Sequence, residues 1–171
     1  MYQLKSRKDL NRVTDISFKD VMSVIPTSVS LISCIEGDAI YGCTISSLVS
    51  LDVSNESPIV AFMLKKGSLV GKKITSNKMF SINVLSAGQE YLAKYYASER
   101  IPDLISENKW KITGNEFPNK ENVKVELNCE YHNIFQDYPA NIFIAKVLHS
   151  SVNKHLAPLV YESRKFISLI K

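Results

Sequence analysis

The sequence predicts a mainly β protein, a closed antiparallel barrel with short helices at its rim. Several segments rich in β-branched and apolar residues follow one another, and turn residues separate them at hairpin spacing. Strand and helix patterns do not alternate, which disfavours a parallel doubly wound sheet. With 171 residues, the chain has the length of one domain of ordinary size.

Short helices are predicted where a capping residue precedes an apolar, periodic segment. Ser17 is a favoured N-cap residue with Asp20 in the capping-box position, and Pro26 ends this first helix. Ser86 is the expected N-cap of the last helix. Residues 1–15 are polar and charged, so we expect a flexible arm before a single domain over residues 16–171. The predicted helices span residues 17–25, 68–76 and 86–97.

Strands are predicted from alternating or continuous apolar residues. Glu36-Gly37-Asp38 is a hairpin turn between the first two strands, and the apolar run 58–64 indicates a strand buried on both faces. Residues 98–123 are charged and interrupted by proline and glycine, so we expect an irregular excursion, either a lid or a loop packing on a dimer mate. The predicted strands span residues 29–35, 39–44, 58–64, 79–85, 125–132, 141–148, 159–161 and 166–169.

Composition disfavours several classes of protein. Hydrophobic residues make up 45% and charged residues 22% of the chain, and no apolar run could cross a bilayer. No secretory signal is recognisable, so we expect a cytoplasmic location. The net charge of +4 comes from scattered lysines without interleaved aromatics, which disfavours nucleic-acid binding and favours a local patch for a small phosphate-bearing ligand. The widely spaced Cys34, Cys43 and Cys129 predict reduced, mostly buried thiols rather than a zinc site.

Well-known catalytic motifs are missing from the chain. It contains no GxSxG, P-loop, GxGxxG or HExxH pattern, and its carboxylates suggest no acid/base pair. His132, His149 and His155 are isolated in sequence, and we expect each to be structural or solvated. Hydroxyl and basic side chains therefore remain as candidates for a ligand site.

Two segments carry these side chains. Thr44, Ser46, Ser47 and Ser50 follow a strand, where hydroxyls and free N–H groups can face a polar ligand. Lys65-Lys66-Gly67-Ser68 leads from a strand into a helix, whose first N–H groups attract an anion. The alternative is that Ser68 only caps the helix and the lysines are solvated.

The order of these segments resembles the flavin reductase-like family, which has the FMN-binding split-barrel fold. Gly42-Cys43-Thr44-Ile45-Ser46-Ser47-Leu48-Val49-Ser50-Leu51 resembles the family signature G-x-T-x-S-S-x-x-S-x. The resemblance covers about residues 17–169. The other matching segments are Phe18-Lys19-Asp20-Val21-Met22, Ile25-Pro26-Thr27-Ser28-Val29, Pro58-Ile59-Val60, Lys65-Lys66-Gly67-Ser68, Phe80-Ser81-Ile82-Asn83-Val84-Leu85 and Pro158-Leu159-Val160-Tyr161.

This resemblance implies an antiparallel, Greek-key-like split barrel with short flanking helices that binds FMN, with FAD also possible. It implies a homodimer that transfers a hydride from NAD(P)H to flavin N5 and supplies reduced flavin to a monooxygenase or another acceptor. The first hydroxyl segment would lie along the ring and ribityl chain, and the region of Ser47, Ser50 and Ser68 would hold the phosphate. The implied cofactor-binding residues are Thr27, Thr44, Ile45, Ser46, Ser47, Ser50, Lys65, Lys66, Ser68 and Asn83.

Three positions depart from the family pattern. Ser28 replaces a glycine, and Ser68-Leu69-Val70 lacks the second hydroxyl and the arginine of the phosphate loop, which Lys65, Lys66, Lys72 or Lys73 would have to replace. Ala140 stands where many members carry a histidine that contacts nicotinamide. Two alternatives therefore stay open. One is a flavin-binding electron carrier or sensor without NAD(P)H activity, and the other is a flavin-free barrel acting as an interaction domain or haem-related binder.

Overall fold

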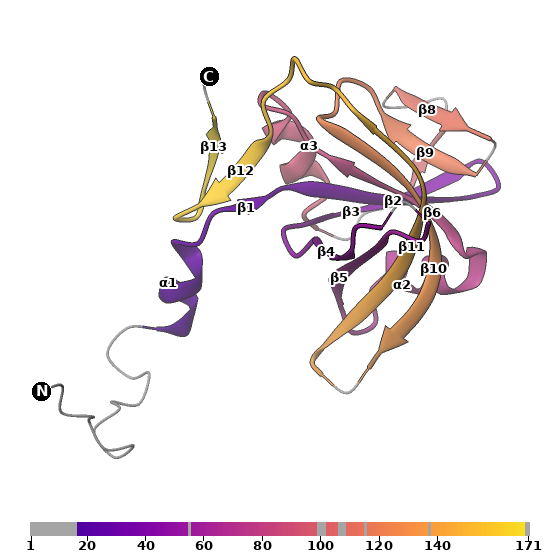
Figure 1. The fold of residues 1–171 in the computed structure, drawn as a ribbon, viewed down its shortest axis with the longest axis horizontal. Coiled ribbons are helices and arrows are strands. Elements are labelled where there is room, and N and C mark those ends of the chain that lie inside the picture. Colours follow the sequence, from indigo (N-terminus) through magenta and orange to yellow (C-terminus); the bar gives the residue numbers. More distant parts are fainter. Residues whose placement is uncertain are drawn as a thin grey trace, which may run out of the picture.

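A computed structural model describes residues 17–54, 56–98, 102–105, 109–114, 116–136 and 138–169. The expected N-terminal arm, residues 1–15, lies outside the described residues. Figure 1 shows a twisted body of strands, with α1 (Phe18–Ser23) and the hairpin of β12 (Leu159–Glu162) and β13 (Lys165–Ser168) projecting to one side of it. No helix among the described residues is long and apolar enough to span a membrane.

The main sheet has eight antiparallel strands in the order β4-β5-β11-β10-β6-β2-β3-β7. Its end strands do not pair with each other in the described part of the chain, so the prediction of a closed barrel is wrong. Both ends are too short to close it, because β7 has two residues and β4 has four with a register shift. The strands are β2 (Ser30–Glu36), β3 (Ala39–Ile45), β4 (Val49–Asp52), β5 (Ile59–Lys65), β6 (Met79–Val84), β7 (Asp103–Leu104), β10 (Val125–Phe135) and β11 (Ala140–Val152).

Two small sheets flank the main sheet. One consists of β1 (Thr27–Ser28), β12 (Leu159–Glu162) and β13 (Lys165–Ser168), and the other of β8 (Trp110–Thr113) and β9 (Phe117–Lys120). The described part of the predicted irregular excursion thus contains three strands, β7 to β9. This part of the prediction is wrong because contacts distant in sequence order the segment.

Strand β9 packs on β2 and β6 with its residues Pro118, Asn119 and Lys120 buried. The Ser33 hydroxyl donates to the Pro118 carbonyl at 2.7 Å. This packing covers a face of β6 that the alternating sequence assigns to solvent, so four consecutive residues of β6 are buried. The run 58–64 shows the reverse error, because Met63 on β5 is 47% exposed although burial on both faces is predicted.

The three helices are α1 (Phe18–Ser23), α2 (Leu69–Asn77) and α3 (Glu90–Tyr95). Ser17 and Ser68 are N-caps as predicted, since their hydroxyls accept from the N–H groups of Lys19 and Gly71. Ser86 is not a cap. Its hydroxyl donates to the Asn122 carbonyl at 2.6 Å, and α3 begins four residues later. The side chain of Asp20 pairs with Arg164 instead of closing a capping box.

The core consists of two apolar clusters. One lies between the main sheet and α2, where the rings of Phe62 and Phe143 stack at 5.2 Å between centroids. In the other cluster, Leu31 and Leu85 pack with Leu92 of α3 and with Tyr96, the residue that follows this helix. Free thiols are confirmed for the cysteines, with Cys34 and Cys129 buried and Cys43 partly exposed.

Candidate cofactor site

The hydroxyl segment opens into a cavity of about 580 Å³, named here the hydroxyl cavity. Thr44, Ile45 and Ser46 form one side of it at the end of β3. Helix α3 and the C-terminal hairpin form the rest. The other lining residues are Val29, Glu90, Ala93, Lys94, Ala97, Tyr161, Arg164, Lys165 and Phe166.

Thr44 joins this segment to α3 through two hydrogen bonds. Its N–H donates to the Tyr96 carbonyl and its hydroxyl donates to the Ala93 carbonyl, both at 2.9 Å. These are among the last carbonyls of a short helix, which need partners outside the helix. Thr44 therefore fixes the distance between the two walls of the hydroxyl cavity, and its hydroxyl oxygen can still accept a hydrogen bond.

A second cavity, of about 220 Å³ and named here the lysine cavity, lies at the N-terminus of α2. Ser68 is 8% exposed and caps this nine-residue helix, and Gly67 before it has a φ of +85°, which favours glycine. The Asn141 Oδ1 atom is buried and has no hydrogen-bond partner among the described residues. The lining residues are Lys65, Lys66, Gly67, Ser68, Gly71, Lys72, Thr75, Ile134, Gln136, Asn141 and Phe143.

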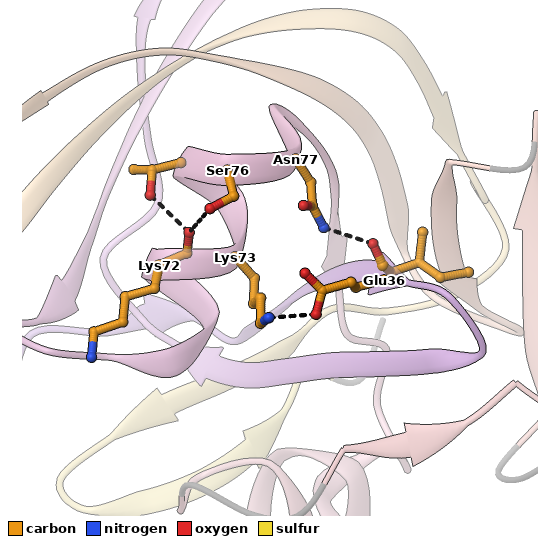
Figure 2. Close-up of polar contacts among 7 residues, drawn as sticks. Glu36, Lys72, Lys73, Ser76 and Asn77 are labelled. Carbon is orange, nitrogen blue, oxygen red and sulfur yellow. Dashed lines mark hydrogen bonds and ion pairs between the residues drawn. The ribbon is translucent and has the colours of Figure 1, made fainter.

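The two adjacent lysines of α2 have different surroundings, as Figure 2 shows. Lys73 forms an ion pair with Glu36 of β2, and this carboxylate raises the pKa of the lysine. Asn77 anchors the same face of the helix by donating to the Ile35 carbonyl at 2.8 Å. Lys72 extends away from this contact and lines the lysine cavity. Of the four lysines considered from sequence, Lys65, Lys66 and Lys72 line this cavity and Lys73 does not.

Ser47 connects the segments that form the two cavities. Its hydroxyl oxygen accepts from the Met63 N–H at 2.9 Å and donates to the Met63 carbonyl at 3.4 Å, which ties the turn before β4 to β5. Lys65 lies two residues further along β5, a distance of about 7 Å at the usual rise of a strand. An elongated ligand with one anionic end could therefore contact Ser46 at one cavity and Lys65 at the other.

The remaining sequence candidates lie outside the linings of both cavities. Thr27 pairs with Tyr161, a lining residue of the hydroxyl cavity, and Ser50 is an exposed residue of β4. Asn83 is fully buried, and its Oδ1 atom accepts from the Lys120 N–H at 3.1 Å. This bond holds β9 on β6.

Sequence reasoning missed the contribution of the C-terminal hairpin. Arg164 lies in its turn with a φ of +61°, lines the hydroxyl cavity, and pairs with Asp20 of α1. Lys165 and Phe166 follow it in the same lining. The basic and aromatic run Arg164-Lys165-Phe166 was the available signal. Asn141 was missed because a lone amide in a strand carries no recognisable pattern.

Comparison with known proteins places this arrangement in a family. A model of the flavin reductase like domain matches residues 22–169, and the chain belongs to that family. The chain is 24% identical over 165 residues to the FMN reductase (NADH) RutF of Escherichia coli O45:K1, covering 95% of this chain and 98% of that protein. It is 25% identical over 138 residues to the NADH-dependent FAD reductase of Streptomyces globisporus, covering 78% and 74%.

Solved structures show the same fold. The NADH:FAD oxidoreductase SgcE6 of Streptomyces globisporus has a TM-score of 0.80 at 21% identity, with 100% of this chain and 99% of that chain covered. BorF, the flavin reductase component of a bacterial two-component tryptophan halogenase, has a TM-score of 0.81 at 21% identity, with 91% and 98% covered. The styrene monooxygenase flavin reductase of Pseudomonas putida S12 has a TM-score of 0.78 at 19% identity, with 90% and 97% covered. The predicted split barrel is thereby confirmed.

Proposed function

We propose that this chain is an NAD(P)H-dependent flavin oxidoreductase that binds FMN and passes reduced flavin to an acceptor such as a monooxygenase. The supporting observation is a cavity with hydroxyl side chains and a cavity with lysine side chains, formed by segments that Ser47 joins to β5, in a member of the flavin reductase-like family. The relatives named above are NADH-dependent reductases of FMN and FAD. Two of the similar structures are reductase components that serve a halogenase and a styrene monooxygenase.

The residues of the two cavities fit the chemistry of FMN. Lys65, Lys66 and Lys72 would balance the phosphate charge, and the free N–H groups at the start of α2 would add donors. The buried, unpartnered Asn141 Oδ1 would accept from a ribityl hydroxyl. Thr44, Ile45 and Ser46 would face the ring. When bound, the flavin supplies the hydride acceptor, and the chain holds and orients it.

A spectroscopic titration tests the proposal. Purified protein should bind FMN, with quenching of flavin fluorescence, and should oxidise NADH or NADPH in the steady state when FMN or FAD is added. If the protein binds neither FMN nor FAD, the proposal is contradicted, and the alternative of a barrel that does not bind flavin is favoured. The titration should be repeated with riboflavin, because the phosphate contacts of the lysine cavity predict weaker binding of the unphosphorylated ligand.

A flavin-binding electron carrier or sensor is the second candidate, and one observation favours it. Ala140, at the position where many members carry a histidine, lies directly opposite Lys65 in the register of β11 and β5. A methyl group there offers nicotinamide no hydrogen bond. Tight FMN binding without turnover of NADH or NADPH would establish this second function and exclude the first.

We also propose that the chain forms a homodimer. Apolar side chains are exposed on β4 and after it, with Leu51 57% and Val53 80% exposed, and Met63 lies nearby on β5. Helix α1 buries none of its residues and exposes Phe18 and Met22. Exposed apolar patches mark protein interfaces, and a second copy of the chain would cover the patch at β4 and the patch on α1. Sedimentation equilibrium measures the mass of the assembly directly.

The cytoplasmic location stays a prediction from sequence.

A further inference from the structure

A buried cluster of charged and aromatic side chains lies on the far side of α3 from the hydroxyl cavity. We name it the Asp103 cluster, and it consists of Tyr95, Tyr96, Asp103, Trp110 and Lys120. Asp103 is 4% exposed, and its carboxylate accepts from Tyr95 Oη at 3.1 Å, from Trp110 Nε1 at 3.2 Å and from Tyr96 Oη. Lys120 is 3% exposed, and its Nζ atom lies 3.7 Å from the centroid of the Trp110 ring.

Burial makes these charges costly. A carboxylate and an ammonium lose most of their hydration in the interior, and their mutual attraction and hydrogen bonds only partly offset that loss. Apolar side chains of similar size could join β7, β8 and β9 to α3 at no such cost. The charges therefore indicate a task beyond holding the segment in place.

Tyr96 connects the Asp103 cluster to the hydroxyl cavity. Its hydroxyl donates to Asp103, while its backbone carbonyl accepts from the Thr44 N–H at 2.9 Å. The Tyr96 ring also packs on Gly42, where an added Cβ would meet it at 3.0 Å. One residue thus joins the carboxylate to the strand whose end, Thr44 to Ser46, lines the hydroxyl cavity.

We propose that the Asp103 cluster positions α3 and Thr44 around the cofactor, and that FMN affinity depends on the charge of Lys120 through this connection. Asp103, Tyr96 and Lys120 are positioning residues, since none of them lines the hydroxyl cavity. The inference rests on the proposed binding of FMN. A positive Lys120 is attracted to the Trp110 ring and to Asp103, so it holds both against the end of α3. A neutral Lys120 loses both attractions, so α3 and Thr44 should be held less firmly at the hydroxyl cavity.

Lys120 can change charge near neutral pH. Burial lowers its pKa to about 8, although the nearby Asp103 carboxylate opposes this shift. Burial and the hydrogen bond to Asp103 raise the pKa of Tyr96, which therefore stays protonated over the same range. The titratable and charged groups around Lys120 come from α3 and the residue after it, from β7, and from the residues just before β8 and just after β9. They are Tyr91, Tyr95, Tyr96, Asp103, Lys109 and Glu121, of which Tyr91, Lys109 and Glu121 share a cavity with Lys120.

Two measurements on the full chain between pH 7 and 9 test the proposal. Trp110 is the only tryptophan of the chain, so its emission without flavin reports the charge of Lys120. We expect this emission to change with a midpoint near pH 8, and the Kd for FMN to rise at least threefold over the same interval. Lys120→Met should remove both changes, whereas Lys109→Met, which removes an exposed lysine of the adjoining cavity, should keep both.

A second pair of variants tests the same proposal if Lys120→Met does not fold. Tyr96→Phe keeps the ring and removes one donor to Asp103, so the carboxylate should attract Lys120 more strongly. The emission midpoint should therefore move to higher pH. The Kd for FMN at pH 7 should nevertheless rise at least threefold, because the hydrogen bond that connects Asp103 to Tyr96 is lost. Tyr91→Phe removes an exposed hydroxyl of α3 and should change neither value.

The results distinguish failure of the positioning role from failure of FMN binding itself. If wild-type protein binds FMN with the same Kd at pH 7 and 9, or if Lys120→Met retains the pH dependence, the positioning role is refuted and FMN binding stands. If wild-type protein binds no FMN at any pH, the proposed function itself fails. Unchanged Kd and emission midpoint in Tyr96→Phe would also refute the connection through Tyr96.

Discussion

Removing the hydroxyl of Ser68 tests the phosphate assignment directly. Ser68 is almost buried at the start of α2 and lines the lysine cavity. A lost hydrogen bond to a charged group costs about 1.5–3 kcal/mol, which is roughly a 10- to 150-fold increase in Kd. Ser68→Ala should therefore weaken FMN binding by about this factor and leave riboflavin binding nearly unchanged, as measured by calorimetric titration of each ligand.

The loss of the helix cap has to be separated from the loss of the phosphate contact. The capping bond to the Gly71 N–H is long, 3.4 Å, so we expect Ser68→Ala to lower the free energy of unfolding by only about 0.5–1 kcal/mol. Ser76→Ala is the matched control, because its exposed hydroxyl lies on the same helix, outside the lysine cavity, and donates to the Lys72 carbonyl. Equal loss of FMN and riboflavin affinity in Ser68→Ala would refute the assignment.

Three further predictions concern packing, pH and assembly. Gly71→Ala should destabilise the fold by about 1–3 kcal/mol in urea titrations, because its Cβ would lie 3.0 Å from the buried Phe143 ring, and unchanged stability would contradict this. The free energy of unfolding of the wild type relative to Lys120→Met should rise by about 1 kcal/mol from pH 8 to 9, because the unfolded chain retains the Lys120 proton that the native state loses near its lowered pKa of about 8. The free energy of unfolding of both proteins should fall above pH 9, because burial raises the pKa of Cys34 and Cys129 to about 12 while the unfolded thiols ionise earlier, and the same pH dependence in both proteins would contradict the contribution of Lys120. Leu51→Glu should convert the proposed homodimer to monomers in sedimentation equilibrium, and a monomeric wild type would refute the dimer.

Local sequence signals predicted most elements of the fold because each depends on near neighbours. The Gly37 turn, with a φ of +58°, joins β2 and β3 as expected, and Ser17 and Ser68 cap their helices. The predicted cap at Ser86 failed because a distant partner, the Asn122 carbonyl, takes its hydroxyl. Propensity cannot report a partner that far away in the chain.

The candidate site was predicted in part. Thr44, Ile45 and Ser46 lie together, and so do Lys65, Lys66 and Ser68, because each set is contiguous in sequence. Asn83 belongs to a segment that matches a family motif, but it lies in the interior beneath β9. Its environment there depends on a strand more than thirty residues away in the chain.

Local patterns in the chain were thus enough to predict the family, the mainly β fold class and the two short segments that form the cavities. Three-dimensional contacts were needed to show that the sheet is open, that Lys72 and not Lys73 faces the lysine cavity, and that Arg164 and Asn141 line the two cavities. They alone assembled Asp103, Trp110 and Lys120 from three strands around Tyr96. The physical reason is that burial and charge pairing depend on which distant segments meet in space.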